Sequence, residues 1–296
     1  MNQSDYSVNQ TDYSVYSVVN YILSKWKSLL LLSFLFSFFT LLISFSVDDW
    51  YLAEARLSAA EIESAPSGSN SFINSLPTGI SIGGNLNEAV IEAKEIIDSR
   101  DFFKRILAYD GIYEGLLKPY SYEAFRTSSD TPKDITLLKR EVDIVMDQNF
   151  FNARSIFNNS LDFEDQLESK YYTITFTHRS PSFAKDIVDI IILELNQKKK
   201  DRDIEESQKS VSFLKNRLLN ETNAEVRGSI SRLIESQIKR EMIANMRQEY
   251  LVSIIDSPTK PISKAGPLRF IIFIISIVIS LGILIPIYAF QYLRRQ

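Results

Sequence analysis

The sequence predicts a membrane-anchored α/β protein, in which two transmembrane helices flank an extracytoplasmic α/β base with a long projecting helical hairpin. Three features of the chain lead to this prediction. Long runs without a charged residue occupy both ends, segments of strand and helix character are interspersed between them, and the stretch from Ser182 to Thr222 contains neither proline nor glycine.

The composition argues against several classes of protein. The chain has 296 residues, and its 33 basic and 37 acidic side chains give a formal net charge of −4, too mild to suggest a nucleic-acid partner. Without cysteine it cannot form a disulfide framework, a thiol nucleophile or a cysteine metal site. The one histidine, His178, has no partner recognisable by motif, and we expect it at the surface. We therefore expect no enzyme activity, no catalytic residue, no cofactor and no metal.

The first predicted transmembrane helix comprises residues 28–47, which contain no charged residue. At about 1.5 Å per residue, such a run matches the roughly 30 Å hydrocarbon core of a bilayer. A buried helix of a soluble protein is the alternative, but two such runs near the two ends, both flanked by charges, favour membrane spans. A cleaved signal peptide is also disfavoured, because its apolar region would be shorter and SFSVDDW offers no small-residue cleavage site.

The second predicted transmembrane helix comprises residues 268–293. Two lysines, Lys25 and Lys27, precede the first span and two aspartates follow it, so we expect both termini to be cytoplasmic. Basic residues at 260, 264 and 269 weaken this charge bias. The chain then divides into a cytoplasmic tail (residues 1–27), an extracytoplasmic domain (48–257), a proline-rich spacer (258–267) and a cytoplasmic end (294–296).

Small polar side chains follow one face of each predicted span. In lipid, small residues let helices approach closely, and their hydroxyl groups hydrogen-bond across the contact. We therefore predict that the spans pack through Ser33, Ser37, Thr40 and Ser44 on the first and Ser276 and Ser280 on the second.

Strands and helices between the spans indicate an α/β base. Residues 51–58 and 172–177 alternate apolar and polar side chains, which predicts two half-buried strands. Residues 87–97 and 99–107 have the spacing of amphipathic helices, the second with Ser99 as N-cap, and residues 135–145 predict another helix. The sequence EYLVSIID, residues 249–256, predicts a buried strand that returns to the base.

A helical hairpin is predicted over about residues 182–248. Its first part is strongly apolar and must be buried, whereas a thin apolar seam runs along the rest, interrupted at ETNAE. Because a hairpin with so thin a seam needs further burial, we expect a homo-oligomer. The seam comprises Ile204, Val211, Leu214 and Leu218 before the break and Val226, Ile230 and Leu233 after it.

Three prolines, Pro258, Pro261 and Pro267, stand directly before the second span. Proline fixes φ and lacks an N–H group, so this segment cannot be helical. The prolines either only end one element before the next begins, or form a semi-rigid spacer that sets how the base stands on the membrane. Termination alone needs one proline, so we favour the spacer.

Several of these segments carry a family resemblance. They include VVNYILSKWKSL, WYLAEARL, SRDFF, YYTITFTHRSPSFAKDIVDIIILELNQ, DIEESQKSVSFLKNRL, and EYLVSIIDSPTKP followed by a membrane helix. With them the chain resembles, nearly end to end, the Wzz-type chain-length determinants, also called polysaccharide co-polymerases.

The resemblance implies a bacterial inner-membrane protein with a periplasmic base that assembles with itself into a ring. It implies that the protein is no enzyme but sets the modal chain length of a lipid-linked, O-antigen-like surface polysaccharide. The implied partners are a Wzy-type polymerase, the undecaprenyl-linked glycan and membrane lipid. Some relatives carry a cytoplasmic tyrosine kinase domain, which we do not expect here because only three residues follow Leu293.

Other functions stay open at this point. The chain could be a capsule or exopolysaccharide export co-polymerase that works with a separate kinase. It could also be a two-span membrane sensor, although the terminal segments leave little to carry a signal. A membrane-tethered hydrolase is the third alternative, for which the sequence offers no recognisable motif.

Overall fold

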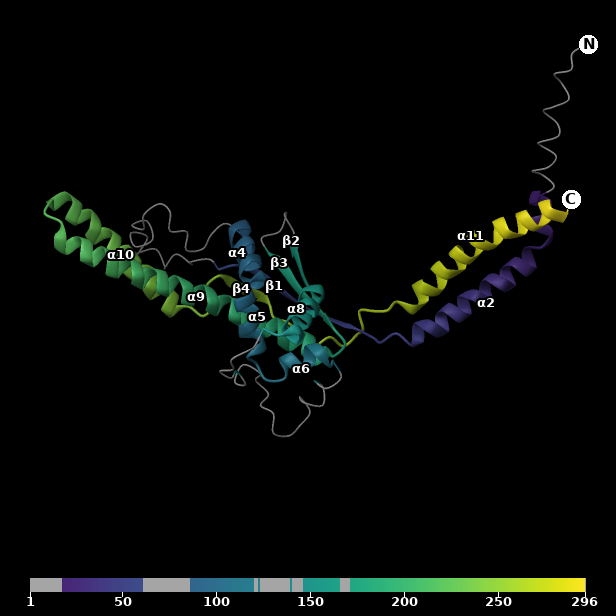
Figure 1. The fold of residues 1–296 in the computed structure, drawn as a ribbon, viewed down its shortest axis with the longest axis horizontal. Coiled ribbons are helices and arrows are strands. Elements are labelled where there is room, and N and C mark those ends of the chain that lie inside the picture. The colour runs from purple at the N-terminus through teal and green to yellow at the C-terminus, as the bar shows by residue number, and fades with distance from the viewer. Residues whose placement is uncertain are drawn as a thin grey trace, which may run out of the picture. The chain divides into compact units, whose positions relative to one another are not determined.

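The computed structural model describes residues 18–60, 86–119, 122, 139, 146–165 and 171–295. It separates into two compact units, one within residues 50–263 and one that combines residues up to 49 with residues from 264 onward. Figure 1 shows the elements of each unit.

The larger unit contains a four-stranded antiparallel sheet with the strand order β2-β3-β1-β4. The strands are β1 (Tyr51–Ala59), β2 (Leu161–Asp165), β3 (Tyr172–His178) and β4 (Val252–Asp256). Along β1 every second residue from Ala53 to Ala59 is buried, as the alternating sequence predicts. The chain thus returns to the sheet after the hairpin and places β4 at the edge beside β1.

Short helices complete the base around this sheet. They are α4 (Leu86–Asp98), α5 (Arg100–Leu107), α6 (Ile112–Leu117) and α8 (Gln148–Ser160). Ser99 caps α5 by accepting from the Phe102 N–H at 3.1 Å, as the sequence predicts, and Asp147 caps α8 in the same way. The core between helices and sheet is strongly aromatic. Five buried phenylalanines each have a ring centroid 5.2–6.1 Å from that of another: Phe103, Phe150, Phe157, Phe176 and Phe183.

The hairpin consists of α9 (Pro181–Asn220) and α10 (Ala224–Met246). Pro181 occupies the first turn of α9, where its missing N–H costs no hydrogen bond, and the Ser180 hydroxyl accepts from the Phe183 N–H at 3.0 Å. The 40 residues of α9 make a helix about 60 Å long. Its first half packs on the sheet and its second half pairs with α10, so one helix serves both the base and the hairpin.

The second unit is a pair of helices, α2 (Trp26–Phe45) and α11 (Arg269–Arg295), which lie side by side (Figure 1). Both are long and apolar enough to cross a membrane, with mean hydropathies of 2.3 and 3.0. Only 22% of the apolar stretch of α2 and 11% of that of α11 is buried, whereas the core helix of a soluble protein would be mostly buried. Most of the large apolar surface of this pair therefore faces outward.

The structure corrects some local expectations. His178 is buried rather than at the surface, with its Nδ1 accepting from the Ser180 N–H at 3.1 Å and its ring 4.1 Å from that of Phe183. The last strand begins at Val252 rather than at residue 249, for a reason given below. The segments β2, α6 and α8 were not expected, and the helix predicted over residues 135–145 lies outside the described residues except at 139.

Candidate functional site

Four serines lie at the centre of the contact between α2 and α11. The Ser33 hydroxyl donates to the Ile277 carbonyl at 3.2 Å and lies within hydrogen-bond distance of Ser280. One turn further on, the Ser37 hydroxyl bonds the Phe273 carbonyl at 2.8 Å and also lies beside Ser276. All four side chains are buried. Their small size lets the two backbones come close enough for side-chain-to-backbone bonds across the pair.

Thr40 and Ser44, predicted for the same face, make no such bond. The Thr40 hydroxyl donates to the Phe36 carbonyl of its own helix at 3.0 Å, and the residue is only half-buried. Ser44 is buried, but its hydroxyl has no hydrogen-bond partner among the described residues. Among the described residues, the side-chain-to-backbone bonds across the pair come from Ser33 and Ser37, and the Ser28 and Tyr288 hydroxyls add a contact at 3.0 Å.

An ion pair joins the helices where α2 ends and α11 begins. The Asp49 carboxylate lies 2.8 Å from Nη2 of Arg269 and 3.4 Å from Nζ of Lys264. The Arg269 guanidinium also lies over the Phe45 ring, 4.8 Å from its centroid. Both basic side chains at this end of the pair are therefore compensated by an acid of the same unit.

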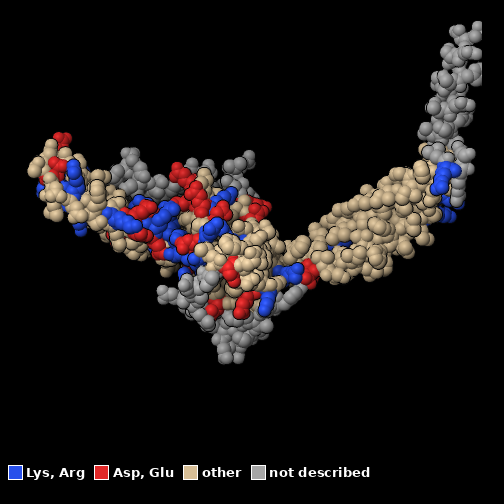
Figure 2. Space-filling view, viewed as in Figure 1, with Lys and Arg blue, Asp and Glu red and all other residues tan. Residues whose placement is uncertain are grey.

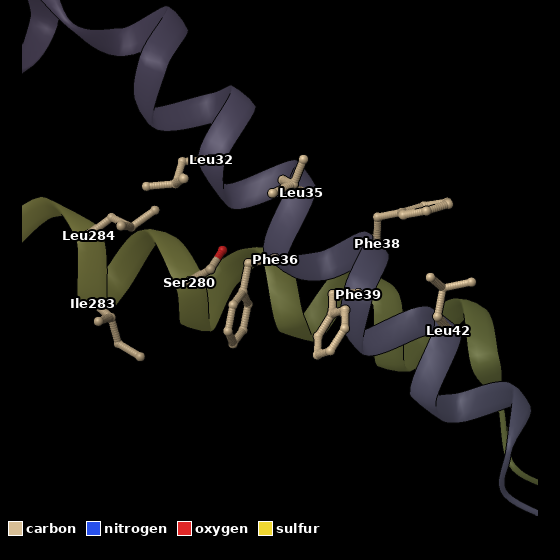
Figure 3. A pocket seen from close by; sticks show the side chains of 9 residues that line it. All are labelled: Leu32, Leu35, Phe36, Phe38, Phe39, Leu42, Ser280, Ile283 and Leu284. Atoms are coloured by element: carbon tan, nitrogen blue, oxygen red, sulfur yellow. The ribbon is translucent and has the colours of Figure 1, made fainter.

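A groove runs along the outside of this pair (Figure 3). Its volume is about 510 Å³, and Ser280 is the one polar residue in a lining made by both helices. It can therefore accept only an apolar group. The lining residues are Leu32, Leu35, Phe36, Phe38, Phe39, Leu42, Ser280, Ile283 and Leu284.

Buried carboxylates fasten α9 to the rest of the base. The residues Asp186, Glu194 and Asp203 are at most 3% exposed, and each accepts a hydrogen bond from a tyrosine hydroxyl distant in sequence. The pairs are Tyr122 to Asp186 at 2.9 Å, Tyr109 to Glu194 at 2.7 Å and Tyr250 to Asp203 at 2.8 Å.

All three acids also have a cation within ion-pair distance, and Asp186 lies 3.9 Å from Nζ of Lys185. Glu194 pairs with Arg105 at 3.4 Å and with Lys139. Asp203 pairs with Lys199 at 3.2 Å and with Arg240 of α10 at 2.9 Å, so it ties together both arms of the hairpin and the segment before β4. A buried charge is tolerated only when it is paired in this way.

The tyrosines of these contacts are held in their neutral form. Burial, and after it the hydrogen bond to Glu194, raises the pKa of the Tyr109 hydroxyl well above its ordinary value. Burial and the neighbouring Asp203 charge do the same to the pKa of Tyr250. Both hydroxyls therefore remain donors throughout the neutral range.

Asn196 clamps the end of the hairpin to the sheet. Its Oδ1 accepts from the N–H groups of Tyr250, Leu251 and Val252 at 3.0, 2.8 and 3.0 Å. Its Nδ2 donates to the carbonyls of Val252 at 3.1 Å and Ile192 at 3.2 Å. These backbone groups are bound to a side chain before the strand begins, which explains why β4 starts only at Val252.

The predicted seam residues differ in their burial. Ile230 is buried, and Ile204, Val211, Leu214 and Leu218 are half-buried, but Val226 and Leu233 are 39% and 44% exposed. The positions most deeply buried between the arms are small or polar, among them Ser207, Ser236 and Ala244. The predicted seam is therefore only part of the contact between α9 and α10.

The three prolines lie in a segment without helix or strand that ends where α11 begins at Arg269. Pro258 and Pro267 are buried and Pro261 is half-buried. Pro261 is therefore the position at which the backbone constraint can be changed with least loss of packing.

The contacts set out above are hydrogen bonds, ion pairs and apolar packing between described residues. Among them, no group of three or more histidine, cysteine, aspartate or glutamate side chains is arranged to hold a metal ion. The buried carboxylates are the feature that sequence reasoning missed. Only Glu194 has a local signal, as an acid inside the apolar run IVDIIILEL, and the partner tyrosines of the three acids are 47 to 85 residues away.

Comparison with known proteins gave matches among solved structures only. No protein-family model and no curated protein sequence matches the chain. A full-length bacterial polysaccharide co-polymerase is 10% identical, with 93% of this chain and 97% of that chain covered and a TM-score of 0.34. A fragment of WzzB, a polysaccharide co-polymerase from Salmonella Typhimurium, is 9% identical, with 74% and 100% covered and a TM-score of 0.31.

Proposed function

We propose that the chain is a Wzz-type polysaccharide co-polymerase, a non-enzymatic regulator of the modal chain length of a lipid-linked surface polysaccharide. The observation that carries this proposal is the order of its elements. An apolar end helix is followed by a sheet-based unit, a long hairpin, a proline-rich segment and a second apolar end helix. This order agrees with the resemblance drawn from the sequence.

In this proposal α2 and α11 span the bacterial inner membrane, with residues 28–47 and 268–293 in the bilayer. Both termini are cytoplasmic, and residues 48–257 form the periplasmic domain. The outward-facing apolar surface of the helix pair supports the membrane location, because lipid would cover it. The partners are a Wzy-type polymerase and its undecaprenyl-linked glycan, and the product is O-antigen-like.

The proposed mechanism is positional rather than chemical. Asn196 and Asp203 hold both arms of the hairpin and the start of β4 on one helix. A force or contact at the hairpin is therefore transmitted to β4 through hydrogen bonds and an ion pair. From β4 the chain passes through the proline-rich spacer to α11, and we propose that this route couples the hairpin to the spans beside the polymerase.

Deletion of the gene, followed by gel separation of the surface polysaccharide, tests the function. We expect the ladder to lose its modal cluster and to regain it when the wild-type chain is supplied. Banding that does not change on deletion would refute a role in chain length. Loss of total polysaccharide, with no change in the length of what remains, would instead favour export together with a separate kinase.

We also propose that the protein works as a ring-like homo-oligomer. Both arms of the hairpin carry exposed large apolar side chains, including Phe213, Leu219, Met242 and Met246, each at least 55% exposed. Burial of these side chains between copies would stabilise an assembly. Light scattering of the chain extracted in several mild detergents should give a mass of many protomers, and a monomer in all of them would contradict the proposal.

A further inference from the structure

The two ends of the α2–α11 pair differ in how their charges are compensated. At the end near Asp49, Lys264 and Arg269 both have that carboxylate as an ion-pair partner. At the opposite end lie Lys25, Lys27 and Arg294, all exposed, for which the described residues supply no ion pair. The sequence places no acid between residues 18 and 47 or after residue 269.

Contacts between the two helices bring these three cations to one end of the pair. The Tyr21 and Tyr292 rings lie 4.8 Å apart, and the Ser28 and Tyr288 hydroxyls are 3.0 Å apart. The basic residues of α2 therefore lie beside the C-terminal end of α11. Figure 2 shows Lys and Arg atoms gathered at this end of the helix pair.

We propose that this end of the pair is a binding surface for the phosphate groups of anionic phospholipids, an inference that rests on the membrane location proposed above. The surface, here named the basic end, comprises Lys25, Lys27 and Arg294, with Arg295 adjacent in sequence. Trp26, 53% exposed, lies between the two lysines, and tryptophan and tyrosine favour the headgroup level of a bilayer. The cations thus stand at the depth where lipid phosphates lie.

Charge decides which lipid is bound. The four basic residues of the basic end exceed the two acids that precede the first span, Asp5 and Asp12. A zwitterionic lipid carries its own ammonium group and compensates the basic end poorly, whereas an anionic lipid has a net negative charge. Each basic residue close to a membrane surface raises the affinity for anionic lipid about fivefold.

Trp26 is a natural reporter for this preference. The chain has two tryptophans, so Trp50→Phe leaves Trp26 as the sole tryptophan, which is excited selectively at wavelengths that tyrosine does not absorb. The full chain with this change is reconstituted into phosphatidylcholine vesicles that contain a fixed small fraction of brominated phosphatidylglycerol or of brominated phosphatidylcholine. We expect the anionic quencher to reduce the Trp26 emission several-fold more at equal mole fraction, and the difference to shrink as salt is raised.

Two charge variants with equal change in net charge make the test specific. Lys25→Gln/Lys27→Gln/Arg294→Gln removes the described cations of the basic end and should bring the two quenchers to nearly equal effect. A matched variant removes three exposed cations of the hairpin unit instead and should retain the wild-type preference: Lys209→Gln/Lys215→Gln/Arg232→Gln.

Several outcomes would overturn the inference. Equal quenching in the unmodified background would show that the basic end does not select lipid, and would favour an acidic protein as its partner. A preference that survives in the first charge variant would place the lipid elsewhere. Absence of quenching by both lipids would refute the membrane location as well, whereas failure of the chain-length role would appear only in the polysaccharide gel.

Discussion

Replacement of Asn196 by alanine is expected to loosen the junction between the hairpin and the sheet. The side chain is 5% exposed, and its Oδ1 is an acceptor for three consecutive backbone N–H groups. Alanine removes this acceptor without offering another, and water has little access to the site. Because an unsatisfied buried donor costs about 1–3 kcal/mol, the loss of the three bonds should destabilise the segment before β4 by roughly 3–6 kcal/mol.

Amide hydrogen exchange on the full chain in mild detergent measures this effect directly. At about 1.4 kcal/mol per factor of ten, a loss of 3 kcal/mol corresponds to roughly a hundredfold faster opening. We expect this acceleration in peptides that cover residues 249–256, with far smaller changes in β1 and β3. Exchange by local opening reports the segment itself, so global unfolding of the protein is not required.

Two further variants separate the acceptor role from simple loss of volume. Asn245→Ala makes the same change at an exposed residue whose hydrogen bond among the described residues is to the Glu241 carbonyl of its own helix, and should alter exchange little. Asn196→Asp keeps the acceptor oxygens but loses the donor to Val252, and should fall between wild type and alanine. If Asn196→Ala leaves residues 249–256 protected, or accelerates them no more than the control, the clamp does not hold β4.

Four other predictions concern the remaining contacts. Ser37→Leu should lower the melting temperature in detergent by several degrees, because the buried side chain lies against α11. Thr40→Leu should change the melting temperature little, because Thr40 bonds its own helix. Equal shifts for the two variants would contradict the hydrogen-bonded contact. Gly115→Ala should destabilise by about 1–3 kcal/mol in denaturant titration, since the added Cβ would lie 2.5 Å from the Phe183 ring. Gly228→Ala, with open space around the new atom, should stabilise the folded protein by about 0.5–1 kcal/mol. If both glycine substitutions stabilised the protein, or both destabilised it, the packing argument would be refuted. The raised pKa values of Tyr109, Tyr172 and Tyr250 mean that the folded state keeps protons which the unfolded chain loses above its ordinary tyrosine pKa of 10.0. The contribution of these tyrosines to the free energy of unfolding is fully present below that pH and falls above it, by about 1.4 kcal/mol per pH unit for each tyrosine. Tyr250→Phe removes one of the three groups and should reduce this slope, measured by circular dichroism at a series of pH values, by about a third. Finally, Pro261→Ala should leave membrane level and oligomer mass near wild type but broaden or shift the polysaccharide distribution; an unchanged modal cluster would mean that this proline is not part of a spacer.

Local patterns in the sequence were enough to predict the main elements. The apolar runs, the alternation along β1 and β3, the cap at Ser99 and the long proline-free stretch each depend on residues that are neighbours in the chain. The structure bears out these elements within a few residues, because helix and strand periodicity is a local property. Spacing also predicts one face of small polar residues on α2, but it does not distinguish Ser37, which bonds across the pair, from Thr40, which bonds its own helix.

Only the tertiary structure decided which buried polar contacts hold the helices and strands together. The acids of α9 read as surface charge or as isolated exceptions in an apolar run, and their burial depends on tyrosines and basic residues that the fold brings from elsewhere. Likewise, Asn196 determines where β4 begins because the backbone of residues 250–252 lies against it, 54 to 56 residues further along the chain. A buried polar group is stable only with its partners in place, and no short-range pattern records which distant residues those partners are.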